Sequence, residues 1–258
     1  MDHTESHQIH SAGQGTPLKV AERPRSRLDD IGGDHINSTG WYTAGELHAA
    51  ADDPMVSRMR NYHSQLHSGF KAIREALLVK DPQLTPEAHL LAVQRKGGSW
   101  LNTMIERSDA VQQQAGAEVK ALNAAIRARV GTPTQHAAEI RTYLRGLDPE
   151  TRHSAMEEAA KAGDTATMAA MLDAPGYLSG LNAQQQDAFR QLYLELHAKD
   201  LLDRRSAVQR ATEINGKAIC EAIDGCAKFF DQKTIGEIVA GSEKAAAARD
   251  AIDKSLSV

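Results

Sequence analysis

The chain has 258 residues, enough for one or two domains with a buried core, and 41% of its residues are hydrophobic although only 4% are aromatic. Its formal net charge of −4 excludes a global attraction to nucleic acid or to an anionic membrane. No apolar run approaches the roughly 20 residues of a transmembrane helix, and no signal peptide is visible. Cys220 and Cys226 do not make a disulfide framework, which favours free thiols in a reducing compartment.

Residues 1–40 differ in composition from the rest of the chain, because Gly, Ser, Pro, Asp and His dominate and no apolar periodicity is present. This composition predicts a polar, extended or flexible arm. The segment carries six acidic residues beside four basic ones, so a mixed-charge solvated arm is favoured over a phosphate contact; the basic residues are Lys19, Arg23, Arg25 and Arg27.

From Trp41 onward the pattern is helical. Four Asp-Pro or Thr-Pro pairs place a capping side chain before a proline at the first helical position, at residues 53–54, 85–86, 132–133 and 148–149. We expect helices near 44–51, 54–79, 86–129, 134–146, 149–162, 165–173, 182–230 and 242–255. This predicts a helical region at 41–131 that contains one long helix, and a second at 132–258 with a corner of short helices.

The helix at 86–129 carries a heptad seam, since eight of its residues follow the spacing 4, 3, 4, 3, 4, 3, 4: Leu101, Ile105, Ser108, Gln112, Ala115, Val119, Leu122 and Ile126. Gly97-Gly98 are candidates for a kink or break in this helix, as are Gly216 and Gly225 in the helix at 182–230. No alternating apolar stretch is long enough to build a sheet. The expected fold is all-α: an elongated helical bundle with long, coiled-coil-like helices and an extended N-terminal arm.

The stretch DAPGYLSGL, residues 173–181, interrupts the helical pattern and invites a catalytic interpretation. Gly163 and Asp164 predict a helix end followed by a new cap, and Asn182 with Gln185 resembles a capping box. Ser179 and Asp173 could take part in chemistry, but neither has a visible partner. We therefore interpret the stretch as a structural corner between helices.

Patterns typical of catalytic or metal chemistry do not appear. His63 and His67 share a helix face, yet the intervening residues SQL lack the glutamate of a zincin and no third ligand is indicated. Phosphate-binding glycine loops and nucleophile elbows are also missing. The sequence favours a protein that is not an enzyme and has no cofactor and no metal, although a site assembled from scattered residues stays open. Basic residues on two helices are interleaved with acids, which favours an ordinary charged surface over a nucleic-acid site; they are Arg127, Arg129, Arg204, Arg205 and Arg210.

Three segments carry a family resemblance: LTPEAHLLAVQ, HAAEIRTYLRGL, and AAKAGDTATMAAMLDAPGYLSGL after an Asp-Pro helix start. Over about residues 60–195 the chain resembles uncharacterised helical proteins of tailed bacteriophages. The resemblance implies a virion or assembly component, and it supplies no catalytic residues.

We therefore expect a structural or interaction protein of a tailed-phage virion, bound to the capsid, connector or internal core and assembled in the host cytoplasm. Its partners would be other virion or assembly proteins and copies of itself, with no membrane contact. The alternatives are a scaffolding or assembly chaperone and a packaged nucleic-acid-binding protein. The expected contact residues are Trp41, Tyr42, Leu101, Ile105, Val119, Leu122, Ile126, Tyr177 and Leu178.

Overall fold

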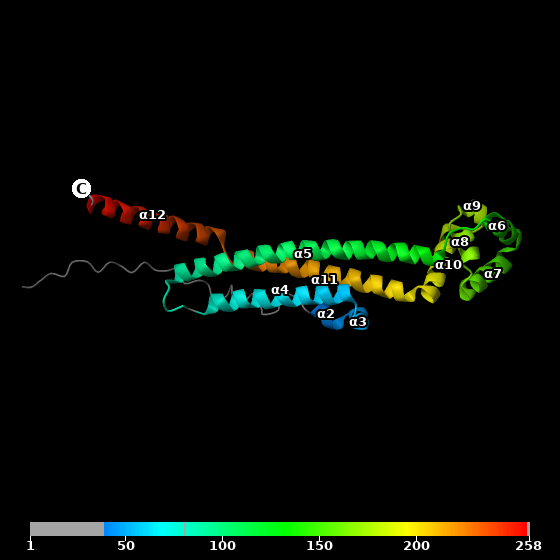
Figure 1. Ribbon diagram of the computed structural model, residues 1–258, viewed down its shortest axis with the longest axis horizontal. Helices are drawn as coiled ribbons and strands as arrows, with labels where there is room; N and C mark the ends of the chain where they lie inside the picture. The colour runs from blue at the N-terminus through cyan, green and yellow to red at the C-terminus, as the bar shows by residue number, and fades with distance from the viewer. Residues whose placement is uncertain (1–38, 80, 257–258) are drawn as a thin grey trace, which may run out of the picture. The chain divides into compact units, whose positions relative to one another are not determined.

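The computed structural model describes residues 39–79 and 81–256, and these residues form eleven helices and no strand (Figure 1). The all-α prediction is confirmed for this part of the chain, whereas the arm predicted at 1–40 lies outside it except for the last two residues. The helices are α2 Thr39–Thr43, α3 Gly45–Ala49, α4 Pro54–Leu78, α5 Pro86–Val130, α6 Ala137–Gly146, α7 Pro149–Ala162, α8 Thr165–Leu172, α9 Gly176–Ser179, α10 Ala183–His197, α11 Lys199–Phe229 and α12 Gln232–Leu256. None of them is long and apolar enough to cross a membrane.

The predicted caps begin three of the longer helices. Asp53 accepts hydrogen bonds from the backbone N–H groups of the second and third residues of α4, at 2.8 and 3.1 Å. Asp148 caps α7 in the same way, whereas Thr85 caps α5 by accepting from the N–H of Ala88 alone; each precedes a proline at the first helical position. The fourth prediction, at Thr132-Pro133, is wrong: a turn closed by the N–H of Ala137 donating to Thr134 O comes first, and α6 begins at Ala137.

Other helix ends also differ from those predicted. The helix expected at 44–51 is present as the shorter α3, and the short helix α2 before it was not predicted. The turn expected at 175–176 continues as the short helix α9. The last helix begins at Gln232 rather than near residue 242, because Gly236 and Gly241 lie inside it without interrupting it. Short helices carry too few apolar repeats to stand out in a sequence.

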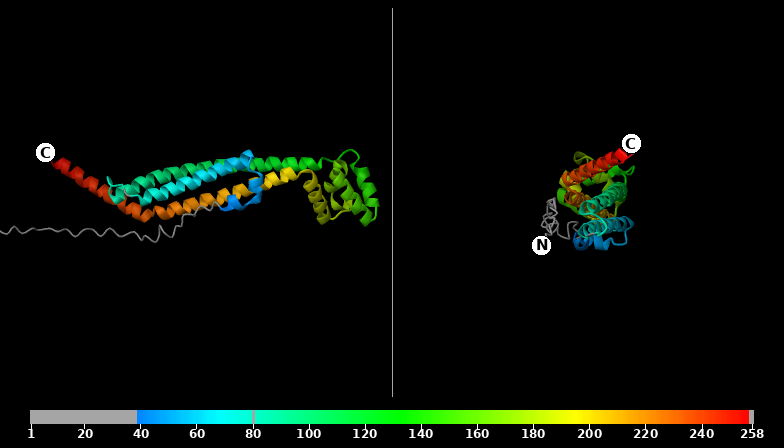
Figure 2. Two further views of the ribbon diagram at one scale, coloured as in Figure 1. Left: turned by 90° about the horizontal axis from the view of Figure 1, so that it is seen from below. Right: turned by 90° about the vertical axis from the view of Figure 1, so that its left-hand side faces the viewer.

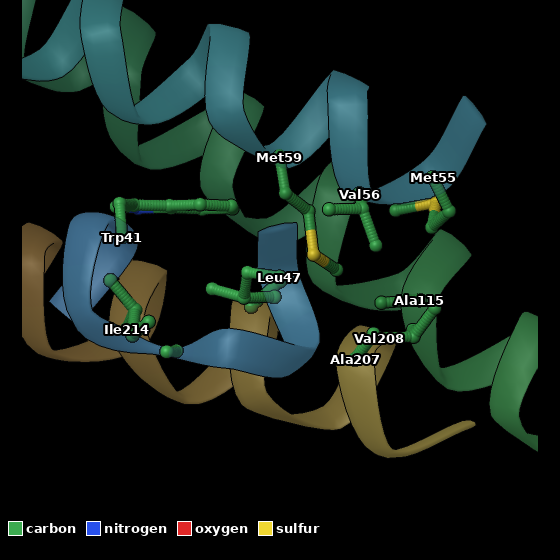
Figure 3. Close-up of a cluster of buried hydrophobic side chains, with 11 residues drawn as sticks. Trp41, Leu47, Met55, Val56, Met59, Ala115, Ala207, Val208 and Ile214 are labelled. Atoms are coloured by element: carbon green, nitrogen blue, oxygen red, sulfur yellow. The ribbon is translucent and has the colours of Figure 1, made fainter. Parts of the chain in front are cut away.

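Three long helices, α4, α5 and α11, lie side by side and bury one core between them (Figures 1 and 2). Larger side chains of α3 and α4, among them Leu47, Val56 and Met59, meet small residues of α5 and α11 (Figure 3). Ala115 of α5 and Ala207 of α11 are at most 1% exposed. Small residues at these contacts allow the helix backbones to approach closely, so methionine and leucine side chains fill the space.

The buried face of α5 departs from the predicted heptad seam. Ser108, Ala115, Leu122 and Ile126 are buried as expected, and Leu101, Ile105 and Val119 are partly buried. Gln112, however, is exposed, and Met104, at 2% exposure, takes the inward position expected for Ile105. The reason is that α5 packs against both α4 and α11, so its inward face is wider than a single seam.

The predicted helix 182–230 is in fact two helices, α10 and α11. The chain turns at Ala198, whose backbone angles are φ −142° and ψ 22° and whose side chain is fully buried. Neither Gly216 nor Gly225 breaks α11, and α5 runs without a break through Gly97 and Gly98. Instead, Gly225 makes room for the ring of Phe70, and Gly97 for Phe230. These glycines serve close packing.

One arginine joins three helices. Arg204 of α11 pairs with Asp53, the capping residue of α4, through a 2.5 Å contact from Nε to Oδ2. Its Nη2 lies 2.6 Å from an oxygen of Glu118 on α5. Asp53 is only 9% exposed, so this pair is better shielded from solvent than a surface ion pair. The same carboxylate therefore starts α4 and ties it to α11.

Replacing Gly163 with alanine is expected to destabilise the protein by about 1 kcal/mol. Gly163 ends α7 in the left-handed conformation, with φ 72°, which a residue with a Cβ atom adopts at a cost. An added Cβ would also lie 3.3 Å from the ring of His197. Urea unfolding would measure the loss, and Gly98→Ala, at an open position inside α5, is the control that should show none. Equal stability of the two variants would show that the left-handed conformation of Gly163 does not require glycine.

Candidate functional site

Four helices, α6, α7, α8 and α10, pack around a second core beside the C-terminal end of α5 (Figure 1). Its centre is methionine-rich: the side chains of Met156, Met168 and Met171 are fully buried. Phe189 and Tyr193 of α10 cover them. We refer to α6–α10 as the corner module, because it contains the stretch that interrupts the helical pattern.

Side chains from α7 and α10 hold the corner module together through backbone carbonyls. Arg152 donates to the carbonyl oxygens of Leu144, Leu147 and Gly180. Gln186 donates to the carbonyls of Met171 and Ala174, at 3.0 and 2.8 Å, and to Ser179 Oγ. These bonds satisfy carbonyl groups at helix ends and in the connecting segments, and they tie α6, α8 and α9 to α7 and α10.

The two residues of this stretch that could take part in chemistry have structural partners. Ser179 is fully buried, and its hydroxyl lies in hydrogen bonds with Gly176 O, the N–H of Leu181 and the Gln186 amide. Asp173 forms a 3.8 Å ion pair with Arg190. The capping box of Asn182 and Gln185 is present, as predicted. The stretch is a corner between helices, and its hydroxyl and carboxylate are engaged in holding it.

The corner module presents large side chains to solvent. Tyr177 on α9 is 78% exposed and Leu178 is 38% exposed, both predicted as contact residues. Tyr143 on α6, which is not among the predicted contact residues, is 69% exposed. A segment whose backbone is already held by hydrogen bonds loses little backbone entropy when a partner covers it.

Tyr143 lies on an open groove of about 580 Å³ between α6, α7 and the start of α8. We call this the acidic groove. Its apolar lining comes from Ile140, Tyr143, Leu144, Ala155, Ala159 and Ala162, and its carboxylates from Glu139, Glu158 and Asp164. No lysine or arginine is among the described residues that line it. The groove therefore suits a segment with an apolar residue flanked by basic ones.

The remaining predicted contact residues divide by exposure. Trp41, Leu122 and Ile126 are at most 6% exposed and pack inside the chain, so their side chains are not at the surface. Leu101, Ile105 and Val119, on α5, are partly buried. Tyr42 is 73% exposed on α2. Exposed contact residues thus come from the short helices, and the seam residues serve mainly the core.

Histidines and cysteines are the candidates for metal or thiol chemistry in residues 39–79 and 81–256. No group of three or more potential ligands comes together in this part of the chain. His63 is 4% exposed and its ring nitrogens have no hydrogen-bond partner there. Cys220 is exposed, and burial raises the pKa of the Cys226 thiol to about 11, which keeps it protonated at neutral pH.

Three of the five arginines weighed for nucleic-acid binding, all on α11, have partners within the chain. Arg204 is shared between Asp53 and Glu118, and Arg210 pairs with Glu213 at 3.0 Å. Arg205 donates to the Asn123 side chain. A guanidinium engaged in this way contributes less positive potential than a free one.

Comparison with known protein families, with curated proteins and with solved structures finds no match to this chain.

Proposed function

We propose that this protein is a structural or interaction protein of a tailed-bacteriophage virion and acts through protein–protein contacts. In this proposal the chain is an elongated bundle with coiled-coil-like helices and an extended N-terminal arm. The observation that supports this proposal is the acidic groove. An apolar surface beside an exposed tyrosine and three carboxylates is suited to a protein partner. The resemblance over residues 60–195 supplies the phage setting.

The partner segment that fits the acidic groove has an apolar side chain flanked by lysine or arginine. Tyr143 would be the central contact, because exposed tyrosine rings bury a large area at a small entropic cost. Glu158 and Asp164 would pair with the flanking basic residues. A virion protein bound at the capsid, connector or internal core, or a second copy of this chain, would present such a segment.

Mass spectrometry of purified virions, made from the phage that encodes this chain, tests the setting. Peptides from the chain at a fixed copy number per particle are the expected result. Their presence in assembly intermediates and loss from mature particles would replace the proposal by a scaffolding or assembly chaperone. A chain released together with the genome, and binding DNA in a salt-dependent manner, would favour a packaged nucleic-acid-binding protein.

Replacing Tyr143 and Glu158 together by serine and lysine is expected to reduce the amount of the chain in purified virions at least about tenfold, since a central aromatic contact and a charge pair are lost. Leu84→Ser is the matched control, because Leu84 is 42% exposed in the segment before α5 and far in sequence from the groove. Circular dichroism would verify that each variant folds. Unchanged incorporation of the groove variant would exclude the acidic groove as the contact surface.

A further inference from the structure

A second cavity, of about 230 Å³, lies between the short helices α2 and α3 and the N-terminal half of α4. It is separate from the acidic groove and does not depend on the proposed function. Its polar lining comes from α2, α3 and two turns of α4: Trp41, His48, Arg60, His63, Ser64 and His67. The volume is too small for a drug-sized ligand and sufficient for a small anion.

Two of the lining side chains are buried polar groups without partners. Trp41 is 5% exposed and His63 is 4% exposed. The indole Nε1–H of Trp41 and both ring nitrogens of His63 have no hydrogen-bond partner among the described residues. Asn215 is next to His63; its Nδ2–H donates to the carbonyl of Met59, at 3.0 Å, and its buried Oδ1 accepts no hydrogen bond from the described residues, so the amide does not satisfy the Trp41 indole. Buried donors left unpaired are costly, and a site for a hydrogen-bond acceptor is one reason for a fold to retain them.

The charge of the cavity favours an anion. Arg60 lies over the Trp41 ring, with its Cζ 5.7 Å from the ring centroid, and its Nη2 donates to Leu47 O at 3.2 Å. These contacts fix the guanidinium and leave it further N–H groups for a ligand. None of the described residues that line the cavity is acidic. A cation would meet the charge of Arg60 with no carboxylate to offset it.

We propose that this cavity binds the carboxylate or phosphate group of a small anion, with Arg60 supplying the charge and Trp41 Nε1 and His63 supplying neutral hydrogen bonds. Arginine forms two parallel hydrogen bonds with either group. The indole N–H then gains the acceptor that it lacks in the protein alone. Ser64 and His67, one turn apart on the same face of α4, lie at the cavity and complete its polar lining.

Nuclear magnetic resonance of the ¹⁵N-labelled full chain tests this proposal through the indole N–H signals. The chain has two tryptophans, Trp41 and Trp100, and a Trp100→Phe variant assigns their signals. Inorganic phosphate and sodium acetate are added in separate titrations, with sodium chloride at matched ionic strength as the control. The expected result is a saturable shift of the Trp41 signal with phosphate or acetate, and none of the Trp100 signal.

An Arg60→Met variant keeps the aliphatic stem over Trp41 and removes the charge, so binding should weaken at least about tenfold. Arg58→Met is the matched control, because Arg58 lies two residues away on α4 and its side chain contacts Gln114 of α5. A shift with phosphate alone or acetate alone supports the proposal and identifies the group bound. Shifts that do not saturate, that equal those with chloride, or that persist unchanged in Arg60→Met overturn it.

Discussion

The free energy of unfolding is expected to fall by about 2 kcal/mol between pH 7.5 and pH 5 because of His63 alone, and by about 3 kcal/mol at pH 4. Burial lowers the pKa of His63 from 6.5 to about 4; the neighbouring His67 adds to this effect, and Asn215 partly opposes it. His63 therefore stays neutral in the folded chain over a range in which the unfolded chain binds a proton.

The sign of this effect follows from the depressed pKa. Well above pH 6.5 neither state is protonated at His63, and its contribution to stability is complete. As the pH falls from 6.5 towards 4, only the unfolded state gains a proton at this residue, so the equilibrium shifts towards unfolding. Below about pH 4 the folded state is protonated as well, and the loss levels off.

Urea unfolding of the wild-type chain and of His63→Gln, at several pH values between 7.5 and 4, measures this contribution. The difference in stability between the two proteins should shrink by about 2 kcal/mol as the pH falls from 7.5 to 5. His89→Gln is the control, since His89 lies on α5 with a ring nitrogen 2.9 Å from Ala76 O. Parallel pH profiles for the wild type and His63→Gln would show that burial of His63 has no such effect.

Asp53→Ala is expected to destabilise the protein by about 2 kcal/mol, roughly twice the loss from Asp148→Ala. Both residues precede a proline and accept two backbone N–H groups at a helix start. Only Asp53 also binds Arg204, so the difference between the two variants isolates the tertiary contact. Asp148→Ala is thus a control within the same chain.

A double-mutant cycle with Arg204→Met separates the cap from the ion pair. If the pair contributes as argued, the coupling energy between residues 53 and 204 should be about 1 kcal/mol, whereas additive losses would contradict it. Burial raises the pKa of Asp53, but the Arg204 hydrogen bond and the two backbone N–H groups outweigh it, so the pKa lies below 3.8. The contribution of Asp53 is lost only as the pH falls through that lowered pKa, outside the range in which His63 acts.

Part of the candidate site was predictable from the sequence. Tyr177 and Leu178 follow a Pro-Gly pair in a short polar-flanked stretch, and both are exposed as contact residues would be. The acidic groove was not predictable, because Glu139 of α6, Glu158 of α7 and Asp164, the cap of α8, follow no linear pattern. The cavity beside Trp41 was missed for the same reason: Trp41 of α2 and Arg60 of α4 meet only in the folded chain.

The sequence by itself determined the all-α class and most helix starts, because capping involves residues within three or four positions of each other. Asp53, Asp148 and Gly163 therefore act as their local chemistry requires. Tertiary structure alone decided that the chain turns at Ala198 and that Met104 rather than Ile105 faces the core. Local sequence could not decide either point, because alanine favours a helix at position 198 and Met104 and Ile105 both suit a core. The turn at Ala198 and the choice of Met104 follow from the packing of α10 on α7 and α8 and of α11 on α4 and α5.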